Sequence, residues 1–284
     1  MTATRFAWNG DVRVAFELRD EAAPEDAPWL VLLHGLGYGR WGWGPIVEPL
    51  GHRFRLVLID NRGIGASDVP EGPYSAADMA SDVIAVLDEA DIDRAHVLAT
   101  SLGGMIALEL ASRHPRRVER LVLVATTPGG GAAYPMPERT QQLIAEMTQL
   151  EPRELLRRAV ENACHDDTVE SNPRLIDRLV SLRLERPQDP AGWRAQAAAG
   201  VAYEAGDRLR SIGAPTLVIH GEGDHVVDPR NADLLAQQIP SARQIRLPGT
   251  GHLSFWEAPE AFVREVTDFL LGDIPSRPEL SELR

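Results

Sequence analysis

The sequence contains no lysine, and all 29 of its basic residues are arginines. This absence excludes a Schiff-base lysine, a P-loop lysine and a lysine general base. Acidic residues outnumber the arginines, with 42 Asp and Glu and a formal net charge of −13. No broad basic face is left to offset phosphate groups, so we expect no nucleic-acid partner and no binding to an anionic membrane.

Cysteine and long apolar runs are also scarce. The single cysteine, Cys164, cannot form an internal disulfide, and it falls in a polar helical stretch without a catalytic pattern. No stretch approaches 18 apolar residues, and the first residues lack the regions of a signal peptide, so we expect a cytoplasmic protein. We expect no metal and no cofactor, because paired metal-ligand spacing is lacking at His52, His96, His114 and His165.

A serine between a buried strand and a helix is the most informative feature of the chain. Residues 95–106 read as a strand that runs into a helix through Ser101, with Ala99 two residues before it and Gly103 two after. Only small side chains fit where a strand reverses so sharply. Such a turn strains the serine and exposes its hydroxyl at a helix N-terminus, which indicates a nucleophile. Ala99 departs from the usual Gly-x-Ser-x-Gly pattern, and an ordinary helix N-cap is the alternative.

Two later segments can supply the base and the acid that a nucleophilic serine needs. Residues 214–221 read as a short buried strand, and Asp224 follows in a loop. His252 lies in a Gly-rich loop after another strand, and the stretch between the two residues suits one helix and one strand. Both side chains can then join Ser101 at the carboxyl edge of a parallel sheet, where ligands gather in open α/β folds.

Strands and helices alternate along the chain, with one long interruption. An Asn-Gly turn predicts an opening antiparallel hairpin over residues 6–18. Apolar strands separated by helices then imply a mostly parallel sheet covered on both faces. Between residues 128 and 212 the sequence predicts helices and no strand. The predicted strands are 29–34, 54–60, 95–100 and 120–125, and the predicted helices are 75–90, 102–114, 138–150, 154–164, 174–184, 191–203 and 231–239.

The chain resembles the α/β-hydrolase superfamily over nearly its whole length. Residues 33–37 are similar to the family's His-Gly oxyanion loop, with Trp43 nine residues past His34. Residues 60–68 are similar to the family's Asp-x-Arg-Gly-x-Gly-x-Ser-Asp segment. The Ala-Pro-Thr-Leu-Val-Ile-His-Gly strand and the Gly-Thr-Gly-His ending are also typical of this family.

The resemblance implies an α/β-hydrolase fold, with a mostly parallel eight-stranded sheet, helices on both faces and an inserted helical cap. We expect residues 1–127 and 213–284 to form the hydrolase core and residues 128–212 to form the cap. The last residues, from Gly272 to Arg284, are expected to be a loose tail.

The resemblance also implies the roles of the site residues. Ser101 is expected to attack a carbonyl carbon, His252 to accept its proton, and Asp224 to orient the imidazole. The backbone N–H groups of Leu36 and Leu102 correspond to the family's oxyanion hole, which stabilises the tetrahedral intermediate.

Several assignments have alternatives. Asp228 could serve as the acid, or Asp224 could merely cap a turn. His220 and His225 adjoin the acid, and loop or core roles are favoured for both. His34 is expected to hold the oxyanion loop through hydrogen bonds and to take no part in catalysis.

The serine at the turn narrows the choice of reaction. Haloalkane dehalogenases and epoxide hydrolases of this fold use an aspartate there, so both are disfavoured. The leading hypothesis is hydrolysis of a carboxylic ester or lactone, with a cap small enough for a modest, largely apolar substrate. The motifs are similar to those of enol-lactonase-like members, but they are shared widely in the family and do not give the specific activity. The expected substrate-binding residues, for each of which core packing is the alternative, are Trp43, Tyr134, Trp193 and Phe255.

Other functions stay open. Hydrolysis of a carbon–carbon bond in a diketone uses the same triad, and cofactor-free haloperoxidase activity is a common side reaction of such sites. A non-catalytic binding protein could keep both the fold and the pocket. The sequence does not give the oligomeric state.

Overall fold

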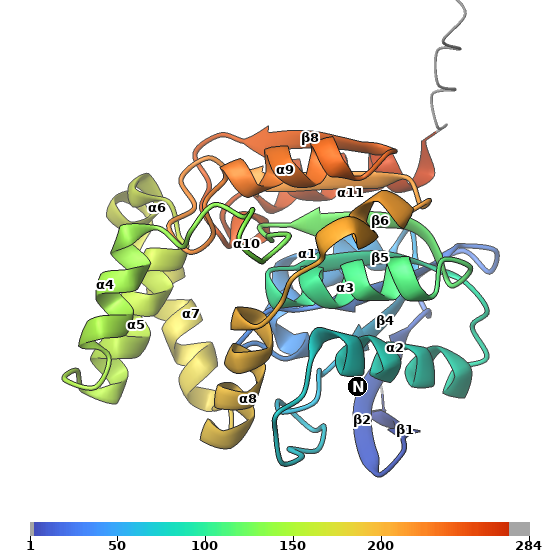
Figure 1. Ribbon diagram of the computed structural model, residues 1–284, viewed down its shortest axis with the longest axis horizontal. Coiled ribbons are helices and arrows are strands. Elements are labelled where there is room, and N and C mark those ends of the chain that lie inside the picture. The colour runs from blue at the N-terminus through green and yellow to red at the C-terminus, as the bar shows by residue number, and fades with distance from the viewer. Residues whose placement is uncertain (1–2, 273–284) are drawn as a thin grey trace, which may run out of the picture.

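The computed structural model describes residues 3–272 and contains one eight-stranded sheet (Figure 1). The tail predicted beyond Gly272 lies outside the described residues. In sheet order, the strands are β1 (Arg5–Asn9), β2 (Val12–Arg19), β4 (Arg55–Ile59), β3 (Trp29–Leu33), β5 (Ala95–Thr100), β6 (Val118–Val124), β7 (Thr216–Gly221) and β8 (Ala242–Leu247).

The direction of the strands confirms the predicted fold class. β1 and β2 form the expected antiparallel hairpin, and β2 is antiparallel to β4. All other neighbouring strands pair in parallel. The carboxyl ends of β3, β5, β7 and β8 therefore meet at one edge of the sheet, where the loops that follow them come together.

Helices cover both faces of this sheet. On β3, Val31 and Leu33 pack into one core cluster, whereas Leu30 and Leu32 pack into the other, as expected when side chains alternate along a strand. The first cluster includes α2 (Ala76–Glu89), α3 (Leu102–Arg113) and α9 (Arg230–Gln238), and the second includes α1 (Gly44–Gly51), α10 (Ser254–Glu257) and α11 (Pro259–Leu271).

Residues 128–212, here called the insertion, connect β6 to β7. Among the described residues of this segment, extended pairing is limited to one bridge between Gly129 and Glu204. Figure 1 shows most of the inserted helices together at one side of the sheet, beyond its carboxyl edge. They are α4 (Glu138–Glu146), α5 (Pro152–Ala163), α6 (Asp166–Ser171), α7 (Pro173–Glu185) and α8 (Pro190–Val201).

The sequence does not predict every helix. α1 carries Pro45 in its first turn and Pro49 inside, which masks its helical pattern. α6 is short and depends on His165, whose side chain accepts a hydrogen bond from the backbone N–H of Asp167. Within residues 3–272, no helix is both long enough and apolar enough to cross a bilayer.

Candidate active site

Ser101 lies at the turn between β5 and α3 in a strained conformation. Its φ is 55° and its ψ is −121°, which residues other than glycine seldom adopt. Strain of this kind costs about 1–3 kcal/mol and persists only where the surroundings impose it. Its backbone N–H donates to the carbonyl of Val124 at 2.9 Å, and its carbonyl accepts from the hydroxyl of Thr126 at 2.7 Å. The side chain makes no capping hydrogen bond, which contradicts the ordinary N-cap.

Small residues around the turn are required by close backbone contacts. A Cβ atom on Gly103 would lie 2.1 Å from the carbonyl oxygen of Leu33. A Cβ atom on Gly35 would lie 2.8 Å from the Cβ of Ser101. Ala99 is fully buried in β5, where its methyl group is accommodated in place of the usual glycine.

The structure brings Asp224 and His252, which the sequence predicts to be the acid and the base, into contact. The Oδ2 of Asp224 lies 2.8 Å from the Nδ1 of His252, and both residues are buried. The other carboxylate oxygen accepts from the backbone N–H groups of Val226 at 2.7 Å and Val227 at 2.9 Å. Burial alone would raise the pKa of Asp224, but the charge of His252 and the hydrogen bonds from two histidines lower it well below its usual range. The acid is thus a fixed carboxylate at neutral pH.

A second histidine, His220, contacts the same carboxylate and was assigned only a loop or core role from the sequence. Its Nε2 lies 2.9 Å from the Oδ2 of Asp224 and 3.1 Å from the carbonyl of Val227. Both neighbours are acceptors at neutral pH, so Nε2 carries a proton and donates. The sequence feature that could have indicated this contact is the position of His220 at the end of β7, four residues before Asp224.

Asp228, the alternative acid, is engaged elsewhere. Its carboxylate binds the guanidinium of Arg230 through several contacts, the shortest at 2.5 Å. The hydrogen bond from Arg230 lowers the pKa of Asp228 despite partial burial. The side chain of His225 contacts the carboxylate of Asp166 at 3.5 Å. The structure therefore favours Asp224.

The oxyanion loop follows β3. His34 is buried, and its Nδ1 accepts from the backbone N–H of Gly35 at 2.8 Å, while its carbonyl accepts from the amide of Asn61. Burial lowers the pKa of His34 to about 3, with a further contribution from His252, so the ring is neutral. These hydrogen bonds are consistent with the predicted role of His34, which is to hold the loop after β3 in place. Within the described part of the chain, the N–H groups of Leu36 and Leu102 donate to no protein acceptor.

The loop that carries His252 contacts the insertion. The backbone N–H of Leu253 donates to the carbonyl of Ala163 at 3.1 Å. Glu257 links the two segments, because its carboxylate accepts from Gly251 at 2.7 Å and from His165 at 2.7 Å. The inserted helices therefore support His252 directly.

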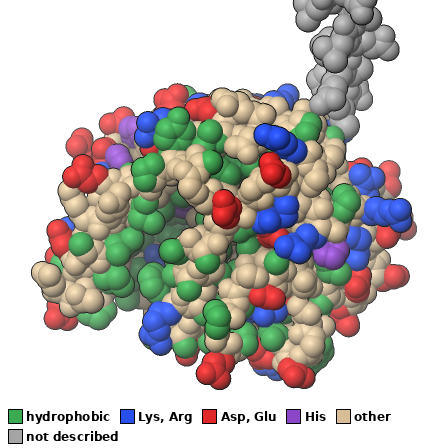
Figure 2. Space-filling model, in the orientation of Figure 1, with side chains coloured by type: hydrophobic (Ala, Val, Ile, Leu, Met, Phe, Trp, Pro, Cys, Tyr) green, Lys and Arg blue, Asp and Glu red, His purple; other side chains and the backbone are tan. Residues whose placement is uncertain are grey.

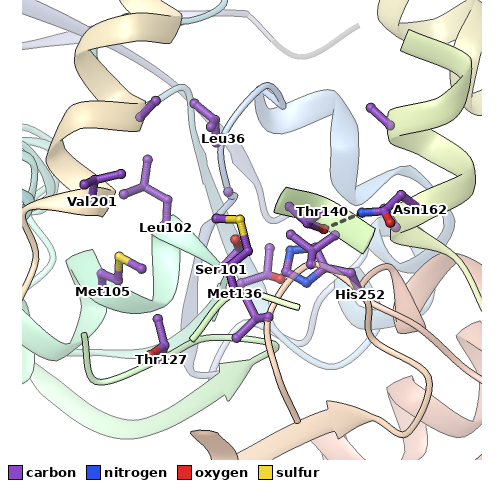
Figure 3. A pocket seen from close by; sticks show the side chains of 18 of the residues that line it. Leu36, Ser101, Leu102, Met105, Thr127, Met136, Thr140, Asn162, Val201 and His252 are labelled. Carbon is purple, nitrogen blue, oxygen red and sulfur yellow. Dashed lines mark hydrogen bonds between the residues drawn. The ribbon is translucent and has the colours of Figure 1, made fainter. Parts of the chain in front are cut away.

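One cavity of about 620 Å³ connects these groups (Figures 2 and 3). Ser101, His252, Leu36 and Leu102 line it, and Figure 3 shows Ser101 and His252 near the centre of the view. Among the described residues no hydrogen bond joins the Ser101 hydroxyl to His252, and such contacts often tighten only when substrate binds. Figure 2 shows the hollow lined mostly by apolar side chains.

The aromatic residues expected to bind substrate divide into two pairs. Tyr134 and Trp193, both from the insertion, line the cavity. Trp43 and Phe255 do not, which corrects the prediction for them: both are fully buried, and their rings pack 4.9 Å apart beside His34. Core packing, the stated alternative, explains both.

Other reactive groups stand apart from the cavity. Cys164 is buried, and burial raises the pKa of its thiol. Within residues 3–272, no cluster of three or more His, Cys, Asp or Glu side chains could hold a metal ion.

Comparison with known proteins identifies the family. Residues 28–259 match the alpha/beta hydrolase fold family, which covers most of the chain, so the chain belongs to this family. The prediction that it is a hydrolase is confirmed by its relatives, whose names include hydrolases and esterases.

Three similar proteins show the range of activities. A 2-hydroxy-6-oxononadienedioate/2-hydroxy-6-oxononatrienedioate hydrolase from Cupriavidus pinatubonensis is 34% identical over 92% of each chain. A pimeloyl-[acyl-carrier protein] methyl ester esterase from Aeromonas hydrophila is 31% identical over 86% of this chain and 95% of its own. The crystal structure of an enol-lactonase from Burkholderia xenovorans is 29% identical, with a TM-score of 0.81 over 94% of this chain and 100% of its own.

Proposed function

We propose that the protein hydrolyses a carboxylic ester or lactone through an acyl-enzyme formed on Ser101. One observation carries this proposal: a strained serine and a histidine already oriented by a buried carboxylate line the same largely apolar cavity. The cavity volume of about 620 Å³ suits a small or medium-sized substrate.

The mechanism follows from the residues present. His252 accepts the proton of the Ser101 hydroxyl as its oxygen attacks the carbonyl carbon, and Asp224 stabilises the imidazolium. Leu36 and Leu102 line the cavity, and their backbone N–H groups, which have no acceptor among the described residues, donate to the oxyanion. Each such donor is worth about 3 kcal/mol. The imidazolium then protonates the leaving alcohol, and a water molecule, activated by the same base, releases the acid.

The relatives support ester chemistry, since a methyl ester esterase and an enol-lactonase are both similar over most of this chain. Carbon–carbon bond hydrolysis is the second candidate. A specific observation favours it: a relative named as a 2-hydroxy-6-oxononadienedioate hydrolase matches 92% of the chain at 34% identity. Such a reaction would use the same three side chains.

A panel of substrates separates the candidates. We expect the purified protein to hydrolyse short p-nitrophenyl esters or lactones, and Ser101→Ala to lower turnover at least about 10⁴-fold while the protein stays folded. Ser112→Ala, which changes a serine on the same helix α3, is the matched control and should keep full activity. Turnover of ring-cleavage diketones alone would favour the second candidate. Turnover of none would favour a binding protein, and an active Ser101→Ala would remove the serine from the mechanism.

A further inference from the structure

The cavity carries one positive charge that no acidic side chain balances. Arg183, on α7, is its single arginine, and Asp228 is its single acidic residue among the described lining residues. Arg230, which lies outside this lining, neutralises Asp228 through close contacts at both carboxylate oxygens. Arg183 forms no ion pair with any described residue. In a chain with a formal net charge of −13, an unbalanced cation at an apolar site requires an explanation.

Contacts with the oxyanion loop hold the Arg183 guanidinium in place. Its carbon lies 4.9 Å from the centre of the Tyr38 ring, which is a cation–π distance. A Cβ atom on Gly37 would lie 2.6 Å from Nη2 of Arg183, so the guanidinium rests directly on this loop. Gly37 has a φ of +82°, and a side chain there would both strain the backbone and displace the arginine.

The same loop contacts the nucleophile. Gly35 packs against Ser101, and Gly37, two residues later, packs against Arg183. Consecutive Cα atoms are 3.8 Å apart, so the Cα atoms of Gly35 and Gly37 are separated by at most about 7.6 Å. Ser101 and Arg183 also line the same cavity, so a substrate held with its carbonyl at Ser101 can place a second group at the guanidinium.

We propose that Arg183 binds a carboxylate on the substrate, so that the protein acts on acyl esters or lactones that also carry a free acid group. This inference rests on the proposed function and adds a substrate class to it. The planar guanidinium presents its N–H donors in a fork that matches the two oxygens of a carboxylate. The insertion provides Arg183, so it sets the substrate, whereas the core provides the reacting groups.

The test compares two esters of equal length. p-Nitrophenyl hemiglutarate carries a terminal carboxylate, and p-nitrophenyl pentanoate does not. We expect the wild-type protein to prefer the charged ester. Arg183→Gln should lower the ratio of kcat/KM for the charged ester to kcat/KM for the neutral ester by about 10- to 100-fold, mainly through KM, because it removes a charge-assisted hydrogen bond. Arg183→Lys, which keeps the charge and loses the fork, should give an intermediate ratio.

Arg174→Gln is the matched control, since Arg174 is an exposed arginine on the same helix and does not line the cavity. Its ratio should equal that of the wild type. If Arg183→Gln leaves the ratio unchanged while both esters are hydrolysed, the carboxylate site is wrong and the proposed function stands.

A binding measurement keeps the inference testable if neither ester turns over. In that case glutarate is titrated into the wild-type protein and into Arg183→Gln by calorimetry, and the lactones of the substrate panel decide the proposed function separately. Binding to the wild type that weakens about 10-fold or more in the variant would support the carboxylate site independently. Equal binding to both proteins, or binding to neither, would overturn it.

Discussion

The core and the insertion of this hydrolase differ in what they contribute to one cavity. The core supplies Ser101, Asp224 and His252 from loops at the carboxyl edge of the sheet, held by short backbone contacts. The insertion supplies Tyr134 from the loop before α4, Trp193 from α8 and other cavity-lining side chains. We therefore expect changes in the core to alter mainly the reaction and changes in the insertion to alter mainly the choice of substrate.

The largest effect is expected at the acid of the core. Asp224→Asn should lower kcat/KM for an ester substrate by about 10⁴-fold, because an amide cannot stabilise the imidazolium and favours the wrong tautomer of His252. Steady-state kinetics would measure this change. The matched variant Asp228→Asn should lower kcat/KM by less than about tenfold, since Asp228 pairs with Arg230. The opposite order would transfer the role of acid to Asp228.

A pH effect on stability should also arise from the core. Burial lowers the pKa of His96 to about 4, below the 6.5 of an unfolded histidine, so the unfolded chain binds more protons than the folded chain between these values. Stability therefore falls as the pH drops through this range. His96 contributes about 2 kcal/mol to the loss between pH 7 and pH 5.

Urea unfolding at the two pH values measures that contribution. In His96→Gln the loss of stability between pH 7 and pH 5 should be smaller by about 2 kcal/mol. An unchanged loss would show that His96 titrates in the folded protein as it does in the unfolded chain.

A smaller effect is expected at the second histidine beside the acid. His220→Leu removes the donor to Asp224 Oδ2 and should lower kcat about tenfold by loosening the carboxylate. His220→Gln can place an amide N–H where Nε2 lies and should recover most of the activity. Loss of activity in both variants to the same extent, with lowered melting temperatures, would point to a packing role alone.

The smallest effect on the chemistry should come from the insertion. Trp193→Ala removes an indole from the cavity wall, so it should lower the preference for a butyrate over an acetate ester by about tenfold. kcat for the acetate should change far less. Arg194→Ala, on the exposed side of α8, is the control. A large loss of kcat for acetate in Trp193→Ala would show that the insertion also shapes the reacting centre.

The core could be predicted from the sequence more fully than the insertion. The strands could be predicted from their buried apolar runs, and the serine turn from the small residues that its sharp reversal requires. The positions of Asp224 and His252 in loops after strands could be predicted in the same local way. Asp224 could be placed in a loop after β7 by such reasoning. Asp224 is favoured over Asp228 as the acid because Arg230 binds Asp228, a contact that no spacing rule gives.

The cavity lining could not be predicted in this way. Trp43 and Phe255 are apolar and lie close in sequence to site residues, yet they point into the core, whereas Tyr134 and Trp193 line the cavity. Which aromatic side chain reaches a cavity depends on how helices of the insertion pack against the core. The place of Arg183 in the cavity lining could not be predicted for the same reason, because its contact with Gly37 joins segments far apart in the chain.

Active-site labelling shows whether Ser101 forms the covalent intermediate. A fluorophosphonate should inactivate the protein with one adduct per chain, and mass spectrometry of peptides should place that adduct on Ser101, with no labelling of Ser101→Ala. An adduct on another residue, or rapid ester turnover by a protein that the reagent leaves unmodified, would contradict the account.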